Sequence, residues 1–272
     1  MVIRRKQIEL VEMVQKDTKR RIGYALVSLF IVLTTWECIA TLLVQNKFIL
    51  PSCTDVIAAF ISLLGSNQLY LDLRTSLLHF GIGISLSLLI GIPIGVCMGW
   101  FTRANLFLDP IIEILRPIPP LAWIPFAIIW FGLTDFSAGF VVFVGSVFPI
   151  IINTYAGFST VPKVFVDAGK VLGCTSSLRQ IRYIAFPSAM PHIVSGFRVA
   201  CGIAWMCLVA AEMFGVSRFG LGQKIWWYYN LHQMDKVMVY ILILGCIGLA
   251  LDTLFRWYID KTLLKWKMGE VS

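Results

Sequence analysis

Charged residues are scarce in this chain of 272 residues, at 14% of the composition, whereas soluble domains carry about 25%. Hydrophobic residues make up 58%, and the mean hydropathy is +0.81. This balance excludes an ordinary soluble domain. It predicts an all-α integral membrane protein with room for roughly five to seven spans of about 20 residues each.

Several catalytic and nucleotide-binding motifs are missing. A P-loop needs Gly-x₄-Gly-Lys-Ser/Thr, but the pair Gly169-Lys170 has Val164 at the first glycine position and is followed by Val171. There is no His-Glu-x-x-His, no Gly-x-Ser-x-Gly, and no Cys-x-x-Cys among the seven cysteines. The three histidines fit no metal spacing. The sequence therefore predicts no catalytic residue, metal site or cofactor.

The hydrophobic runs predict six membrane spans: Ile22–Val44, Ser76–Trp100, Ile118–Phe131, Phe136–Tyr155, Ile193–Phe214 and Val237–Trp257. The third is short and contains several prolines, which remove helix donors and clash with the preceding turn. It should be kinked or partly unwound. Irregular backbone is tolerated at membrane depth only where protein covers it or where it lines a cavity, so we expect this span near a path through the protein.

Basic residues indicate the orientation. With the N-terminus in the cytoplasm, most of the 23 Lys and Arg residues fall inside; those outside are Lys47, Arg74, Arg218, Lys224 and Lys236. The positive-inside rule therefore predicts two cytoplasmic termini, with residues 1–21 and 266–272 flanking a membrane domain at 22–265. The same distribution accounts for the net charge of +8, so nucleic acid is not expected as a partner.

Small residues at four-residue spacing predict helix-packing seams, within one chain or between two copies: Gly91, Gly95 and Gly99, then Gly196, Ala200 and Ala204. Acids inside the spans, Glu37, Glu212 and Asp252, are candidates for function because burying a charge in lipid is costly. For Asp252 an ion pair with Arg256 is favoured. The aromatic segment 215–236 suggests an interfacial belt or an outer gate.

A polar loop at residues 159–191 separates two apolar runs. Ser159-Thr160 before Pro162 is a helix-start signal, and Gly173 is placed to end a helix of about two to three turns. Asp167 should fall early in that helix. A second segment, Ser176–Phe186, should end at Pro187.

This loop resembles the EAA loop of ABC importer permeases, whose pattern is Glu-Ala-Ala-x₃-Gly-x₉-Ile-x-Leu-Pro. Ala168 and Gly173 match the pattern, Asp167 replaces its Glu, Gly169 replaces its second Ala, and Pro187 comes one residue later than expected. Further segments resemble the nitrate/sulfonate/taurine-type permeases: Arg116–Pro125, Trp130–Gly132, Phe148–Tyr155, Ala211-Glu212 and Gly220–Gly222. The resemblance covers about residues 36–265.

The resemblance implies a type I importer permease with six helices in a prokaryotic plasma membrane. Two permease copies would pair, two ATPase subunits would dock on the loop, and an outer binding protein would deliver the solute. The loop residues would couple the permease to ATP hydrolysis. Candidate path or gate residues are Pro120, Trp123, Pro125, Phe148, Asn153 and Glu212.

The solute stays open between a small oxyanion (nitrate, a sulfonate, taurine or bicarbonate) and a vitamin precursor, because no ring of basic residues appears in the spans. Two other readings are an ion-gradient-driven transporter and a membrane scaffold. The first predicts inverted repeats and paired midplane acids, which the sequence does not show. The second would not need a coupling helix.

Overall fold

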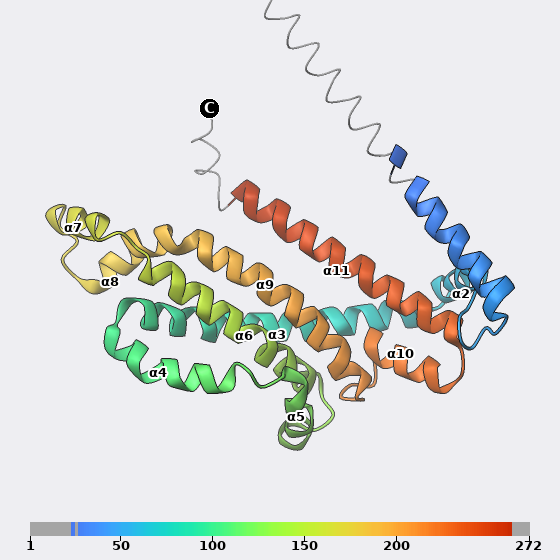
Figure 1. The fold of residues 1–272 in the computed structure, drawn as a ribbon. Helices are drawn as coiled ribbons and strands as arrows, with labels where there is room; N and C mark the ends of the chain where they lie inside the picture. The colour runs from blue at the N-terminus through green and yellow to red at the C-terminus, as the bar shows by residue number, and fades with distance from the viewer. Residues whose placement is uncertain (1–22, 25–26, 263–272) are drawn as a thin grey trace, which may run out of the picture. The chain divides into compact units, whose positions relative to one another are not determined.

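The structure, a computed structural model, describes residues 23–24 and 27–262, with side chains as far as Trp257. Every regular element in this described part is helical (Figure 1). The two terminal segments predicted at 1–21 and 266–272 lie outside it. The chain divides into two compact units, Met1–Leu63 with Tyr228–Val239, and Leu64–Trp227 with Tyr240–Ser272.

The first unit contains the helical span Val27–Val44, which ends in the π-helix η1 (Ile39–Val44), and helix α2 (Cys53–Leu64). Glu37 caps α2. Its carboxylate accepts hydrogen bonds from the backbone N–H of Cys53 at 2.7 Å and of Thr54 at 3.3 Å. These are donors that a helix start leaves without partners, and a negative charge there also complements the helix dipole. Glu37, a candidate for function in the sequence, therefore holds two helices of this unit together.

The second unit is built on three long helices, α3 (Asn67–Trp100), α6 (Asp135–Ser159) and α9 (Phe186–Met213) (Figure 1). Along α3, Gly83, Gly91 and Gly99 face Val142, Ile150 and Phe158 of α6 in turn. Residue numbers rise together on the two helices, so α3 and α6 are parallel. Between α6 and α9 the order reverses: Gly145 faces Cys207, whereas Gly157 faces Ala189. These two helices are antiparallel.

The predicted glycine seams lie within one chain. A Cβ atom added at Gly95 would lie 2.6 Å from Cβ of Thr154, and one added at Gly196 would lie 2.5 Å from Cβ of Asn153. Ala200 and Ala204 are fully buried. The helix axes approach so closely that only hydrogen fits at these glycines, which is how small residues promote helix packing in lipid.

The third span differs from its prediction. Helix α4 (Thr102–Leu115) already belongs to it, and is followed by the 3₁₀ turn η2 (Pro120–Trp123) and helix α5 (Ile124–Phe131) with a bend of 88°. Since α3 and α6 are parallel, the chain between them must cross the bundle once in the opposite direction. The third span is one broken crossing. It is unwound as expected from its prolines, but it begins at Thr102 rather than at Ile118.

Two other spans are longer than predicted. Helix α3 starts at Asn67 instead of Ser76, and the fifth span extends from Ser177 to Met213 instead of starting at Ile193. The hydropathy of the first extension is lowered by polar residues such as Asp72, which is buried and receives a 2.9 Å hydrogen bond from the Tyr240 hydroxyl. A polar side chain that is hydrogen-bonded inside the protein can lie within a membrane span, so its presence does not indicate a loop.

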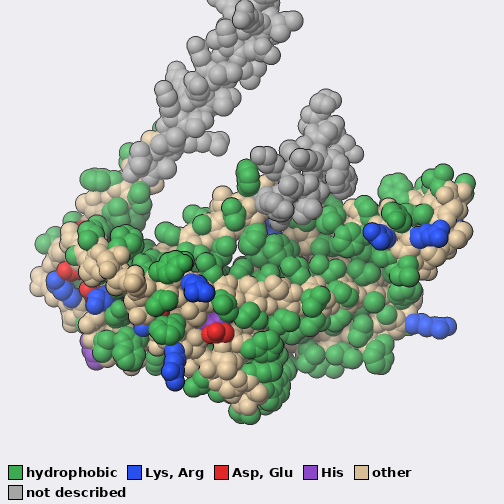
Figure 2. Space-filling view, turned by 180° about the vertical axis from the view of Figure 1, so that it is seen from behind, with side chains coloured by type: hydrophobic (Ala, Val, Ile, Leu, Met, Phe, Trp, Pro, Cys, Tyr) green, Lys and Arg blue, Asp and Glu red, His purple; other side chains and the backbone are tan. Residues whose placement is uncertain are grey.

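The remaining elements complete the second unit and the chain. Helix α7 (Lys163–Val171) is followed by the one-turn helix α8 (Ser177–Gln180) and the π-helix η3 (Ile181–Ala185), which leads into α9. Helix α10 (Leu221–Asn230) precedes α11 (Met234–Thr262). In α11 the predicted Asp252–Arg256 ion pair is confirmed at 2.8 Å. Hydrophobic side chains cover most of the face in Figure 2, as expected of helices that contact lipid.

Candidate functional site

Helix α7 has the length and the ending that the sequence predicts. Its nine residues stop before Gly173, which has a positive φ of 91°. Two bonds close the end: Cys174 N–H donates to the Gly169 carbonyl at 2.8 Å, and Gly173 N–H donates to the Lys170 carbonyl at 3.1 Å. This pair of bonds is the Schellman cap, in which glycine avoids the steric cost of the left-handed conformation. The end of α7 is therefore defined by local chemistry.

Three details of the loop differ from the prediction. Ser159 and Thr160 close α6 rather than opening α7, since the Thr160 hydroxyl donates to the Ala156 carbonyl at 2.8 Å and Pro162 precedes α7. Asp167 lies in the middle of α7 and forms a 2.9 Å ion pair with Lys170. Pro187 does not end the second segment of the loop, which continues into α9. It lies in the first turn of α9 directly after η3, and a widened π-turn accommodates a ring that a regular helix would exclude.

The loop is tied firmly to the bundle. Gly169 is buried against Ile184 of η3, with no room for a larger side chain unless Ile184 moves. The buried Gln180 amide donates to the Cys174 carbonyl at 2.8 Å. Because η3 runs directly into α9, a force on α7 reaches the long helix α9 through contacts rather than through a slack linker.

The loop around α7 exposes large apolar side chains on its surface. The exposed fraction of the residue surface is 73% for Val164, 88% for Val171 and 86% for Leu172. Phe165 and Leu178 are exposed as well. We call these five residues the apolar loop surface. Lys and Arg side chains lie at the same end of the second unit (Figure 2). Exposed apolar side chains gathered among polar groups mark surfaces that contact another protein or a membrane.

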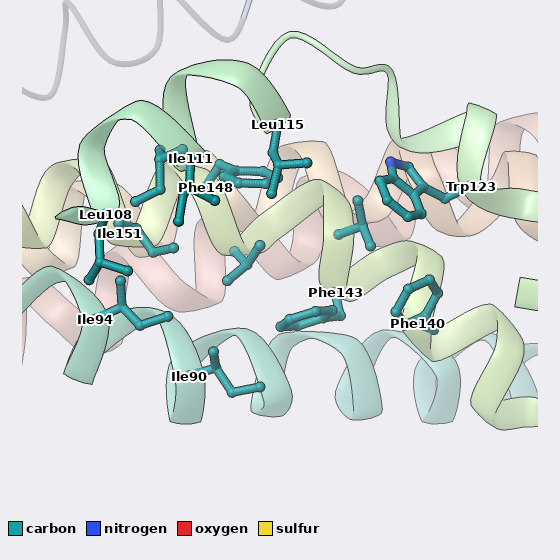
Figure 3. A pocket seen from close by; sticks show the side chains of 13 residues that line it. Ile90, Ile94, Leu108, Ile111, Leu115, Trp123, Phe140, Phe143, Phe148 and Ile151 are labelled. Carbon is teal, nitrogen blue, oxygen red and sulfur yellow. The ribbon is translucent and has the colours of Figure 1, made fainter. Parts of the chain in front are cut away.

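Four of the six candidate path residues line one or both of two pockets. Pro120, Phe148 and Asn153 line a pocket of about 330 Å³ together with Arg116, Val199 and Ile203, among others. Trp123 and Phe148 line a second pocket of about 310 Å³. Figure 3 shows this second pocket walled by aliphatic side chains of α3 and α4 and by phenyl rings of α6. Pro125 lies in the first turn of α5 and lines neither pocket.

Glu212 has a different environment from the other path candidates. It is completely buried in α9. The Ser76 hydroxyl donates to its carboxylate at 2.8 and 2.9 Å, and the Gly222 N–H donates to it at 2.9 Å. His79 Nδ1 lies 2.9 Å from Glu212 Oε1. The carboxylate is thus surrounded by donors from α3 and α10, as a buried charge requires.

The Glu212 environment extends into a larger polar network. The second ring nitrogen of His79 lies 2.9 Å from Asp135 Oδ1 at the start of α6, and Leu221 N–H donates to the Ser76 hydroxyl at 2.9 Å. Each of the two contacts of His79 needs one proton to be a hydrogen bond. A neutral imidazole carries a proton on only one of its nitrogens, and an ionised carboxylate carries none. The two contacts together therefore require one further proton. The network joins α3, α6, α9 and α10.

Sequence reasoning identified Glu212 but missed its partners. Asp72, Ser76 and His79 lie four and three residues apart on one face of α3, whereas Asp135 and Tyr240 come from other stretches of the chain. Asp72 and Tyr240 bond to each other and belong to the wider network rather than to Glu212 itself. The available signal was that polar residues recur inside apolar segments, where they are expected to pair with one another. No cluster of three or more possible metal ligands occurs among the described residues.

A bundle of apolar spans, one of them broken, with a capped helix projecting from the loop before α9, defines the class: an integral membrane subunit of a transport system. The chain belongs to the family of binding-protein-dependent transport system inner membrane components, which its residues 87–263 match. It is a permease subunit of the ABC transporter type, and ATP is not hydrolysed on this chain.

Relatives from several organisms agree with this assignment. The chain is 40% identical to a Methanocaldococcus jannaschii protein named as an ABC transporter permease, covering 86% of this chain and 88% of that protein. It is 30% identical to the taurine transport permease TauC of Escherichia coli, covering 93% and 92%. It is 34% identical to the nitrate import permease NrtB of Synechococcus elongatus, covering 85% and 86%.

The fold is that of a solved importer. A chain of the inward-facing MetNI methionine ABC transporter superposes with a TM-score of 0.55 at 19% sequence identity, covering 69% of this chain and 96% of that chain. The prediction of an all-α, type I importer permease is confirmed.

Proposed function

We propose that this chain forms the translocation path of an importer for a small oxyanion, and that α7 with its flanking loop couples the path to a pair of ATPase subunits. The observation that carries the coupling assignment is the apolar loop surface. Val171 and Leu172 are almost fully exposed although they lie beside a well-formed cap. Leaving such side chains in water has a cost that contact with a partner protein removes.

The mechanism follows from the connections of the loop. Closure of an ATPase on the apolar loop surface would push α7, and the contacts of Gly169 with Ile184 and of Gln180 with Cys174 would carry the displacement to α9. Since α9 packs along α6, the lining of the pocket between them would change with it. A chain without a P-loop needs such a partner for transport driven by ATP.

Charge variants on the loop test the coupling proposal. Val171→Asp and Leu172→Asp remove apolar contact area and leave the fold intact, because both side chains are exposed. The matched control is Thr175→Asp, which adds the same charge at an exposed position of the same loop that lacks a large apolar group. We expect the first two variants to lose co-purified ATPase and solute uptake, and the control to keep both. Normal uptake in the Val171 and Leu172 variants would refute the assignment.

The remaining partners and the orientation belong to the same proposal. A second copy of this chain would complete the path, and an extracytoplasmic binding protein would deliver the solute. Both termini and α7 would face the cytoplasm of a prokaryotic cell, as the imbalance of basic residues favours. Labelling of Thr175→Cys by an impermeant thiol reagent, in a background without the native cysteines, tests this: protection in intact cells is expected, and labelling without permeabilisation would reverse the topology.

The solute class is supported by the names of relatives, which include nitrate, taurine and bicarbonate permeases. A thermal-shift screen of the cognate binding protein against nitrate, bicarbonate, sulfonates, and thiamine or flavin precursors is the direct test. A large shift with one oxyanion supports the proposal. A shift with a heterocycle alone would reassign the system to vitamin precursors.

A further inference from the structure

We propose that Arg116 is an oxyanion-binding residue on the translocation path, at the middle of the membrane, with Asn153 as a second donor. This inference rests on the proposed function and names the chemistry with which the path recognises its solute. The sequence places Arg116 in a cytoplasmic loop between the second and third spans. The structure places it elsewhere.

Arg116 lies at the break of the third span, directly after α4. It lines the 330 Å³ pocket together with Val144–Gly145 and Phe148–Pro149 of α6 and with Val199 of α9. These residues lie near the centres of two antiparallel spans. A helix of 25 residues such as α6 is about 37 Å long, slightly more than the hydrocarbon thickness of about 30 Å. The centre of α6, and Arg116 beside it, is therefore near the bilayer midplane.

The guanidinium of Arg116 is not neutralised within the described part of the chain. Glu113 lies one helical turn earlier, yet no ion pair joins the two among the described residues. The other residues that line the pocket are uncharged. An arginine facing hydrocarbon at this depth costs roughly 2.5–3.5 kcal/mol on insertion scales. Such a residue is stable only where it faces water or a counter-ion, which is the environment of a solute path.

The pocket is open on the surface of the single chain. Arg116 is exposed, and half of Val199 is exposed. This opening contains the exposed and unpaired cation Arg116 at mid-span, within a face of exposed apolar side chains. The apolar pocket of Figure 3 differs, because its lining contains no charged residue. The charged pocket suits a hydrated ion, and the apolar one does not.

The donors of the pocket match an oxyanion. The planar guanidinium presents paired N–H groups that fit two oxygens of a nitrate, carboxylate or sulfonate. The Asn153 amide uses one hydrogen for the Pro149 carbonyl at 2.8 Å, which leaves its second hydrogen for a ligand. Pro120, also in the lining, has no N–H to donate. Arg116 is consequently the dominant donor, and its charge opposes the passage of a cationic heterocycle.

The test uses the intact importer with its ATPases in proteoliposomes, supplied with its binding protein and labelled nitrate, bicarbonate or taurine. Arg116→Gln should lower oxyanion uptake about tenfold to a hundredfold, since a charge-assisted hydrogen bond is replaced by a neutral one. Arg116→Lys, which keeps the charge but loses the paired donors, should retain intermediate uptake. Arg103→Gln is the control: it removes a charge from α4, the helix that precedes Arg116, at an exposed position that does not line the pocket.

A charge-rescue experiment separates recognition from folding. In Arg116→Cys, modification by a positively charged thiosulfonate should restore part of the uptake, whereas a neutral thiosulfonate should not. The control is the chain that retains Arg116, treated with the same two reagents. Equal uptake by Arg116→Gln and Arg103→Gln would overturn this inference and leave the importer assignment standing. Failure of the unaltered complex to transport any oxyanion, with uptake of a heterocycle instead, would overturn the oxyanion class itself.

Discussion

His79 and Glu212 lie 133 positions apart in the sequence, and His79 Nδ1 is 2.9 Å from Glu212 Oε1. Both side chains are completely buried. The opposite ring nitrogen of His79 is 2.9 Å from Asp135, half of which is exposed at the start of α6. One imidazole therefore connects α3, α6 and α9 at the end of the bundle where α10 begins.

Loss of the Glu212 carboxylate should destabilise the protein. Glu212→Ala leaves the Ser76 hydroxyl, the Gly222 N–H and His79 without their acceptor in a buried site, at a cost of about 3–5 kcal/mol. Thermal unfolding in detergent measures the loss, with Glu113→Ala on the exposed surface of α4 as the control. Glu212→Gln keeps the shape and should be the milder change. Full stability of Glu212→Ala together with altered solute selectivity would make Glu212 a path residue instead.

Gly220 should tolerate no side chain. Its φ is +138°, and a Cβ atom there would lie 2.5 Å from Cδ of Glu212. Gly132 is the matched control, because it also has a positive φ, of 70°, but has open space around it. Gly132→Ala measures backbone strain alone, and the additional loss in Gly220→Ala, about 1–3 kcal/mol of overpacking, measures the clash with Glu212. Equal losses in the two variants would show that the turn moves away from Glu212 at no cost.

The glycine seam of α3 gives a second matched pair. Gly95→Ala places a Cβ atom 2.6 Å from Cβ of Thr154, whereas Gly81 of the same helix has nothing within 4 Å. We expect Gly95→Ala to destabilise the chain by about 1–3 kcal/mol. Gly81→Ala should be neutral or stabilising, because alanine favours the helix. Comparable unfolding temperatures for both variants would contradict the close approach of α3 and α6.

The cap of α7 should matter for coupling and not for membrane insertion. Proline cannot adopt the φ of +91° found at Gly173, so Gly173→Pro breaks the two bonds that end the helix. Asp167→Arg replaces the exposed ion pair with Lys170 by two like charges. Both variants should insert into the membrane normally but lose solute uptake. ATP hydrolysis by the partner subunits should then no longer depend on transport.

Gly202→Ala, with open space around it, serves as the control for Gly173→Pro, and Asp167→Asn serves for Asp167→Arg. Membrane fractionation, uptake and ATPase rates are measured on the same preparations. Normal uptake in Gly173→Pro or in Asp167→Arg would remove the loop from the coupling mechanism.

The sequence alone determined the membrane class, the glycine seams, the Asp252–Arg256 pair and the end of α7, because each depends on hydropathy or on contacts within about one helical turn. Only the tertiary structure decided which polar residues pair across helices, that Glu37 caps α2, and that Arg116 stands beside the centre of α6. Arg116 follows a 14-residue helix that hydropathy assigned to a loop. Its depth is set by the parallel packing of α3 and α6, which forces the segment between them back across the membrane, and no local pattern encodes such a long-range constraint.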